Sequence, residues 1–188
     1  MATVRILALA DAPPHRPVAD LVAEHRPALV VLLGDLQPAW VADVATLDVP
    51  RIGVHGNHDA PGLLGRLGAE DVHLRAVDVG GVRFAGLAGA PAYSRGASAF
   101  EWTPAQAQAL VARLPAADVL VTHTPPLGVD DEPDDPVHRG FAALGPWVAR
   151  HRPRWLLHGH TQPDPRRRVA RIGATRVVHV RGDAIVEL

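Results

Sequence analysis

The sequence contains no cysteine and no lysine, so its 19 basic residues are all arginine. Without cysteine the chain forms no disulfide and offers neither a thiolate ligand for zinc nor a cysteine nucleophile, which fits a reducing compartment such as the cytoplasm. The arginine bias fits a skewed genome at least as well as a selected chemistry. The formal net charge of −1 provides no overall field that would attract nucleic acid or an anionic membrane. We therefore expect a cytoplasmic protein that binds neither.

Long hydrophobic runs are also absent. The longest, such as residues 6–10 and 28–33, are much shorter than the roughly 20 residues that a membrane-spanning helix needs. Residues 1–11 lack the basic head and cleavage site of a secretory signal peptide, so we expect no export signal there. A chain of 188 residues, 47% of them hydrophobic, can still bury a substantial core, and we expect one domain over residues 1–188.

Strand-like apolar runs alternate with segments of helical periodicity. Strands are expected at residues 3–10, 28–33, 50–54, 72–79, 82–87, 118–122 and 154–157, with three short ones within 168–188. Helices are expected at residues 18–25, 38–45, 63–67, 103–114 and 141–148. The alternation predicts a layered α/β fold in which the final strands build a second sheet.

Five of the ten expected strands end at or shortly before a polar residue that can bind a metal ion. In chain order these endings are Asp11, Asp35, Asn57-His58-Asp59, His123 and His160. Because the carboxyl ends of parallel strands meet at one crevice in an open α/β sheet, we expect these side chains to lie together. Oxygen and imidazole ligands suit manganese, iron or zinc, and two ions about 3.5–4 Å apart need a bridging carboxylate. Asp35 is the residue that we expect to form this bridge.

The endings form local motifs: G-D at residues 34–35, G-N-H-D at 56–59, T-H at 122–123 and G-H-T at 159–161. Their order resembles the calcineurin-like metallophosphoesterase superfamily, and the resemblance extends from residue 11 to residue 160. It implies an α/β fold built as a layered αββα-type sandwich of two mixed β-sheets flanked by helices. It also implies a metal-dependent phosphoesterase, either a phosphatase or a phosphodiesterase, that acts on a small phosphate ester.

The resemblance implies a ligand set for two divalent ions. Asp35 matches the carboxylate that bridges both ions, and Asp11 matches a ligand of the first. Asn57, His123 and His160 match the remaining ligands of the second ion. The second ion therefore keeps its full set of ligands.

The resemblance also implies the groups that move protons. His58 matches the residue that protonates the leaving group, and Asp59 matches the residue that orients its imidazole. The expected mechanism is an in-line attack on phosphorus by metal-activated hydroxide, with His58 as general acid. Tyr93 and Arg95 lie in a loop between a strand and a helix, and we expect them to line the substrate pocket.

The first ion's site departs from the family pattern. Pro13 stands where the D-x-H motif has histidine, and Gln162 stands where the last motif has its second histidine. Loss of two imidazole ligands should weaken this site by at least about 100-fold, so we expect one tightly bound ion and at most a weak second. Substitutes are the Gln162 amide oxygen and His15, which follows the Pro-Pro turn.

These losses leave an alternative function open. The favoured function is a metal-dependent phosphoester hydrolase, with activity reduced by the weakened site. The alternative is a metal-binding scaffold or interaction module that keeps the fold without hydrolysis, although such a scaffold has no use for the His58–Asp59 pair. Residues 130–135 are expected to form a solvated loop or a lid. Five further histidines are expected at the surface or in the core: His25, His73, His138, His151 and His179. His55 and His158 are expected to lie beside the ligands without binding the ion.

Overall fold

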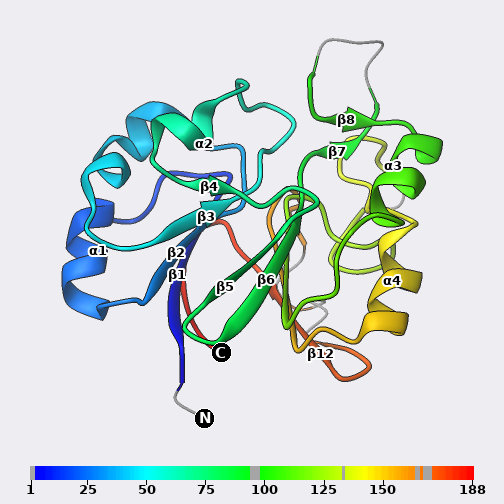
Figure 1. Cartoon of the computed structure of the whole chain (residues 1–188). Helices are drawn as coiled ribbons and strands as arrows, with labels where there is room; N and C mark the ends of the chain where they lie inside the picture. Colours follow the sequence, from blue (N-terminus) through cyan, green and yellow to red (C-terminus); the bar gives the residue numbers. More distant parts are fainter. Residues whose placement is uncertain (1–2, 94–97, 133, 164–165, 167–170) are drawn as a thin grey trace.

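The computed structural model describes residues 3–93, 98–132, 134–163, 166 and 171–188. Two β-sheets lie face to face, with a pair of helices on the outer side of each (Figure 1). The helices are α1 (Val18–His25) and α2 (Leu63–Arg66) on one side, and α3 (Pro104–Val111) and α4 (Leu144–His151) on the other. The predicted αββα-type sandwich is therefore confirmed.

The first sheet has the strand order β13-β1-β2-β3-β4. Its strands are β13 (Gly182–Glu187), β1 (Arg5–Ala10), β2 (Leu29–Leu32), β3 (Arg51–Gly53) and β4 (Glu70–Asp71). All neighbours are parallel except β13, which pairs antiparallel with β1. The sheet is mixed because the end of the chain returns to cover the free edge of β1.

The second sheet has the order β11-β12-β10-β9-β6-β5. Its strands are β11 (Arg171–Ile172), β12 (Thr175–His179), β10 (Trp155–His158), β9 (Val119–Thr122), β6 (Val82–Leu87) and β5 (Ala76–Val79). The four central strands are parallel. The expectation that the final strands together form a second sheet is only partly right, because β13 joins the first sheet.

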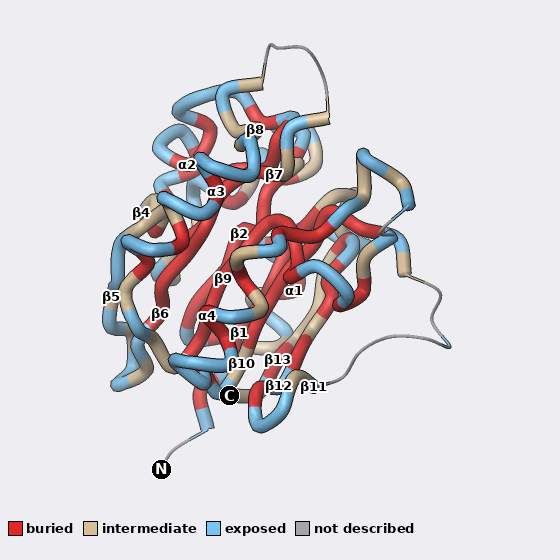
Figure 2. The backbone as a smooth tube through the Cα atoms, turned by 90° about the vertical axis from the view of Figure 1, so that its right-hand side faces the viewer, coloured by how far each residue is buried: buried red, intermediate tan, exposed pale blue. Residues whose placement is uncertain are grey.

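Both faces of each large sheet are buried, which explains the continuous apolar runs. In β1, Ile6, Ala8 and Ala10 point into the core between the sheets, whereas Leu7 and Leu9 point to the core under α1 and α2. A third core lies between the second sheet and the helices α3 and α4. Figure 2 shows the central strands of both sheets as buried and the helices as partly exposed.

Two expected elements are interrupted. The helix expected at 38–45 is two 3₁₀ turns, η1 (Pro38–Trp40) and η2 (Ala42–Thr46), because Val41 between them leaves helical geometry with φ −128°. The strand expected at 72–79 is formed only at its end, as β5, because Leu74 adopts φ 56°. Among the described residues, no helix combines the length and the apolar character needed to cross a bilayer.

The strand ends of both sheets meet at one edge. The backbone N–H of Asp11, after β1, donates to the carbonyl of Gly34, after β2. In the second sheet, the N–H of Gly159, after β10, donates to the carbonyl of His123, after β9. A short pair of strands, β7 (Ala90–Pro91) and β8 (Glu101–Trp102), lies at the end of the molecule opposite the two termini (Figure 1).

Candidate metal centre

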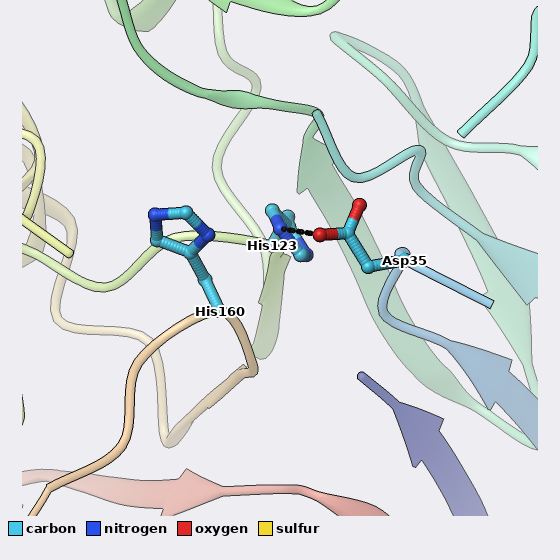
Figure 3. A group of neighbouring side chains, drawn as sticks. All are labelled: Asp35, His123 and His160. Atoms are coloured by element: carbon cyan, nitrogen blue, oxygen red, sulfur yellow. Dashed lines mark ion pairs between the residues drawn. The ribbon is translucent and has the colours of Figure 1, made fainter. Parts of the chain in front are cut away.

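Four predicted ligands come together where the strands end. Asp35, His123 and His160 each offer a ligand atom, and these atoms all lie within 4.8 Å of one another (Figure 3). The side-chain oxygen of Asn57 lies 3.1 Å from Nε2 of His123. We call these four residues the ligand cluster. One carboxylate, one amide oxygen and two imidazoles form a donor set that suits a borderline divalent ion, so the cluster fits the second metal of the family pattern.

His123 is fully buried and fixed by the backbone of the other sheet. Its Nδ1 donates to the carbonyl of Leu33 at 2.8 Å, which directs Nε2 toward Asp35, whose Oδ2 is 3.4 Å away. Burial alone would lower the pKa of His123, but the charge of Asp35 and the contact with it raise the pKa to about 9. Without an ion the imidazole is therefore protonated at neutral pH.

The environment of Asp35 favours its ionised form. Burial alone would raise the pKa of this carboxyl, but the His123 charge and the backbone N–H of His58 lower it to about 2. That N–H donates to Oδ1 at 2.8 Å, while Oδ2 faces His123. Asp35 is thus a carboxylate at any physiological pH.

His160 completes the cluster as a neutral imidazole. Its Nε2 donates to the carbonyl of Val137 at 2.8 Å, so Nδ1 is the nitrogen with a free lone pair. Burial, with the neighbouring charge of His123, lowers its pKa to about 3. Both imidazoles of the cluster therefore have one nitrogen held by a carbonyl, and Nε2 of His123 must lose its proton before it can bind an ion.

The backbone is strained where it delivers three of these residues. Asp11, Asp35 and His160 have φ angles of 58°, 53° and 67°, in the left-handed region that non-glycine residues seldom adopt. Each such conformation costs on the order of 1–3 kcal/mol, and strain of this kind gathers at functional sites. All three residues lie one to three positions after the ends of strands β1, β2 and β10.

The glycines of the G-D and G-N-H-D motifs allow two loops to touch. A Cβ on Gly34 would lie 2.2 Å from the backbone nitrogen of Gly56, and a Cβ on Gly56 would lie 2.1 Å from Oδ1 of Asp35. Neither position has room for a side chain. The close approach places Asn57 and His58 directly beside Asp35.

Asp59 has a structural role that the sequence did not indicate. Its buried carboxylate accepts hydrogen bonds from the backbone N–H groups of Gly56, Asp35 and Leu36, at 2.8, 3.0 and 3.0 Å. Within the described part of the chain, no hydrogen bond joins it to the imidazole of His58. The expected orienting contact is absent because three backbone donors occupy the carboxylate. Asp59 instead fastens the two ligand-bearing loops together.

His58 is exposed at a pocket of about 450 Å³ that also contains Asp11, Asp35 and His160. The pocket gives its imidazole access to a bound molecule and to solvent. Of the two residues expected to line a substrate pocket, Tyr93 accepts a hydrogen bond from Nδ2 of Asn57 at 3.2 Å. Tyr93 therefore orients a predicted ligand. Arg95 lies outside the described residues.

The other half of the pocket, which we call the depleted side, carries Asp11 and Gln162, while Pro13 lines a separate pocket. Oδ2 of Asp11 accepts the backbone N–H of His160 at 2.8 Å, so this oxygen is in use. Burial raises the Asp11 pKa to about 6. Gln162 lies in the pocket wall. His15, the other substitute ligand, is held by Asp183, whose oxygens lie 2.8 and 2.9 Å from its Nδ1. These residues do not fit a tightly bound first ion.

The pocket also contains residues that the motifs did not identify, namely Arg66, His138 and Arg181. Nδ1 of His138 lies 2.7 Å from the carboxylate of Asp135, and its ring centroid is 5.8 Å from that of His160. No sequence signal marked these residues, since each lies in a loop, a short helix or a turn whose position depends on the tertiary fold.

The acidic segment is also less exposed than expected. Asp130 is buried, and its carboxylate lies 3.4 Å from Nε2 of the buried His158. This contact fastens the start of the segment to the end of β10. Residues 130–135 therefore do not form a wholly solvated loop.

The strand-end ligand cluster, set on a sandwich of two mixed sheets, defines the class to which the chain belongs. Residues 5–164 match the family described as calcineurin-like phosphoesterase, and the protein is a member of that family. The family has a metal-dependent phosphoester hydrolase fold.

Two solved structures share this fold. One crystal structure has a TM-score of 0.73 at 17% identity, covering 99% of this chain and 95% of its own. The other is TT1561 of Thermus thermophilus, with a TM-score of 0.60 at 18% identity, covering 95% of this chain and 89% of its own. At such low identity they establish the fold alone. No curated protein matches the chain.

Proposed function

We propose that this protein is a hydrolase that uses one tightly bound divalent ion to cleave a small phosphomonoester or phosphodiester. The observation that carries the proposal is the ligand cluster itself, in which four donors from four separate strand ends face one point. Manganese, iron and zinc suit these donors. The proposal includes a cytoplasmic location, which is supported only by the cysteine-free composition.

The chain's own residues would prepare the site in three ways. A divalent ion in the cluster would supply Lewis-acid polarisation of a phosphoryl oxygen and would lower the pKa of a water molecule. The carbonyls of Leu33 and Val137 hold the far nitrogens of the two histidines, and Tyr93 holds the Asn57 amide. These contacts preorganise the donors, so that little rearrangement is needed when an ion binds.

His58 would donate a proton to the leaving oxygen. Its imidazole is exposed at the pocket, and its backbone N–H is bonded to Asp35, which keeps the residue next to the ligand cluster. Histidine is the side chain that most often serves as a general acid, so this imidazole could pass a proton to the departing alkoxide. Because Asp59 is bonded to the backbone, His58 acts without a carboxylate partner in this scheme.

One observation favours a second candidate, a metal-binding scaffold. The depleted side does not fit a first ion, and a single ion lacks the symmetric clamp on the attacking and leaving oxygens. The two functions differ in turnover. A scaffold would bind one ion and hydrolyse nothing.

The test is to measure metal content together with hydrolysis of aryl phosphate monoesters and diesters in added manganese. We expect one ion per chain and measurable turnover of one ester class. One ion with no turnover under manganese, iron or zinc would favour the scaffold. Two tightly bound ions would mean that the depleted side provides ligands that the described geometry does not show.

A further inference from the structure

The depleted side contains a positively charged side chain in addition to its acidic one. Arg181 lies in the wall of the pocket that holds Asp11, Asp35 and Gln162. It is exposed, and among the residues that the structure describes no hydrogen bond or ion pair occupies its guanidinium group. A free guanidinium inside a pocket is available to an anionic ligand.

Strand pairing explains why Arg181 reaches this position. In the antiparallel ladder of β1 and β13, the last pair is Ala10 and Gly182. Asp11 and Arg181 are the next residues beyond this pair, so both lie at the same end of the ladder. Gly182 has φ 79°, and a Cβ there would lie 3.2 Å from the carbonyl of Pro13. The turn that carries Arg181 therefore lies against the segment in which proline replaces the family's histidine.

The turn is fastened on both sides of Arg181. The backbone N–H of Val180 donates to the carbonyl of His158 at 2.8 Å. On the other side, the carboxylate of Asp183 accepts the backbone N–H of His15 at 2.8 Å and also contacts its ring. The backbone at Arg181 is thus held between the two sheets, while its side chain is free to contact a ligand.

The chemistry of a guanidinium group fits this location. It is always charged, and its planar fork of N–H donors matches the oxygens of a phosphoryl group. Arg181 acts electrostatically on Asp11, since its charge lowers the Asp11 pKa against the larger effect of burial. A positive charge therefore already acts at the carboxylate that the family uses for its first ion.

We propose that Arg181 replaces the first metal ion functionally, by binding a non-bridging oxygen of the substrate's phosphoryl group beside the ion in the ligand cluster. This inference rests on the proposed function. The pocket would then combine one divalent ion with one arginine, and its substrate must present a phosphoryl group with at least two oxygens free to be bound.

The test measures binding of inorganic phosphate to the manganese-loaded protein, without turnover. We expect Arg181→Gln to weaken phosphate binding by about 10–100-fold, the effect of losing a charge-assisted contact, while one manganese ion stays bound. Arg181→Lys should bind phosphate with an affinity between those of the unchanged protein and Arg181→Gln, because lysine keeps the charge but lacks the planar fork of donors. The control is Arg176→Gln, which removes the same charge from β12, where Arg176 stacks on Trp155 at 4.9 Å. Unchanged phosphate affinity in Arg181→Gln overturns the inference.

A metal titration provides a second measurement. The double variant Pro13→His, Gln162→His restores both missing imidazoles. A second manganese ion should bind at least about tenfold more tightly to the triple variant that also carries Arg181→Gln than to the double variant. A second-ion affinity that does not depend on residue 181 overturns the assignment. If phosphate binding requires Arg181 but no ester is hydrolysed, the proposed function fails separately. If hydrolysis is observed and is insensitive to residue 181, only the inference fails.

Discussion

The ligand cluster and the depleted side both contribute residues to one pocket, but the same kinds of side chain make different contacts in each. In the cluster, a backbone carbonyl binds one nitrogen of each histidine, and the second nitrogen of His123 faces Asn57 and Asp35. On the depleted side, His15 is bound to Asp183, and Asp11 uses an oxygen on the backbone of His160. The comparison indicates that a metal site depends on which donor atoms the rest of the chain leaves facing one another.

Asp35 and Asp11 also differ in the pKa of their carboxyl groups. The pKa of Asp35 is lowered to about 2, because His123 and a backbone N–H more than offset burial. The pKa of Asp11 is raised to about 6, because burial outweighs the contacts that lower it. Asp35 is thus prepared for a cation, whereas an ionised Asp11 costs the metal-free protein stability.

The largest expected effect is the difference in metal binding between a variant of Asp35 and a variant of Asp11. Asp35→Asn should weaken binding of manganese by more than about 100-fold and abolish hydrolysis, because it removes the only carboxylate of the ligand cluster. Asp11→Asn is the matched control and should retain one ion per chain. Equal loss of metal content in the two variants would remove the distinction between the two sides.

The next largest effect concerns turnover. His58→Ala should reduce the turnover number by about 100 to 10,000-fold and leave metal content unchanged, since the imidazole is exposed in the pocket and not part of the ligand cluster. Steady-state kinetics alongside metal analysis would check both. Normal turnover in this variant would exclude His58 as the proton donor.

The stability of an Asp59 variant tests whether this residue holds together the two loops that carry the ligand cluster. Asp59→Ala should lower the free energy of unfolding by about 3 kcal/mol, because three buried backbone N–H groups lose their acceptor. Asp118→Ala, which removes a single acceptor from Arg83 far along the second sheet, should cost about 1 kcal/mol. Denaturant unfolding measures both. If Asp59→Ala kept full stability and lost only turnover, Asp59 would act on the imidazole after all.

Metal binding should depend on pH through the ligand cluster. Because the pKa of His123 is about 9 without an ion, a metal must displace its proton, and affinity should rise about tenfold per pH unit below pH 9. His160, with a pKa of about 3, adds no such dependence. Calorimetry in two buffers of different protonation enthalpy should report about one proton released at pH 7. Zero release would contradict the raised pKa.

The smallest expected effect belongs to the depleted side. The raised pKa means that the folded state disfavours ionised Asp11, so this residue lowers stability as pH rises from its ordinary value of 3.8 through about 6. Asp11→Asn should therefore raise the unfolding temperature of the metal-free protein by a few degrees at pH 8 and by little at pH 4. The amide oxygen can still accept the His160 N–H. A lower unfolding temperature at pH 8 would mean that the carboxylate stabilises the fold.

Much of this arrangement follows from local sequence. Apolar runs buried on both faces identified the sheet strands, and the polar residue after each run identified the ligand cluster, because strand ends in parallel sheets converge. The helix expected from residue 103 is α3, which begins with a capping box formed by Thr103 and Gln106. These features depend on nearest neighbours in sequence or on the general geometry of sheets.

Other features depend on contacts between distant segments and could not be read from the sequence. The pairing of β13 with β1 joins residues 182 and 10, and only this pairing places Arg181 in the pocket. The backbone role of Asp59 depends on the distance between two loops. The contact between His15 and Asp183 could not be predicted either, because the two residues are 168 positions apart in the sequence.

The late position of β13 also affects the order of assembly. All four members of the ligand cluster lie at or before residue 160, whereas the turn with Arg181 and strand β13 come after it. A nascent chain therefore contains every member of the ligand cluster before it contains the strand that covers the edge of β1. Because a domain generally folds as a unit, we expect the cluster to assemble only after β13 has been synthesised.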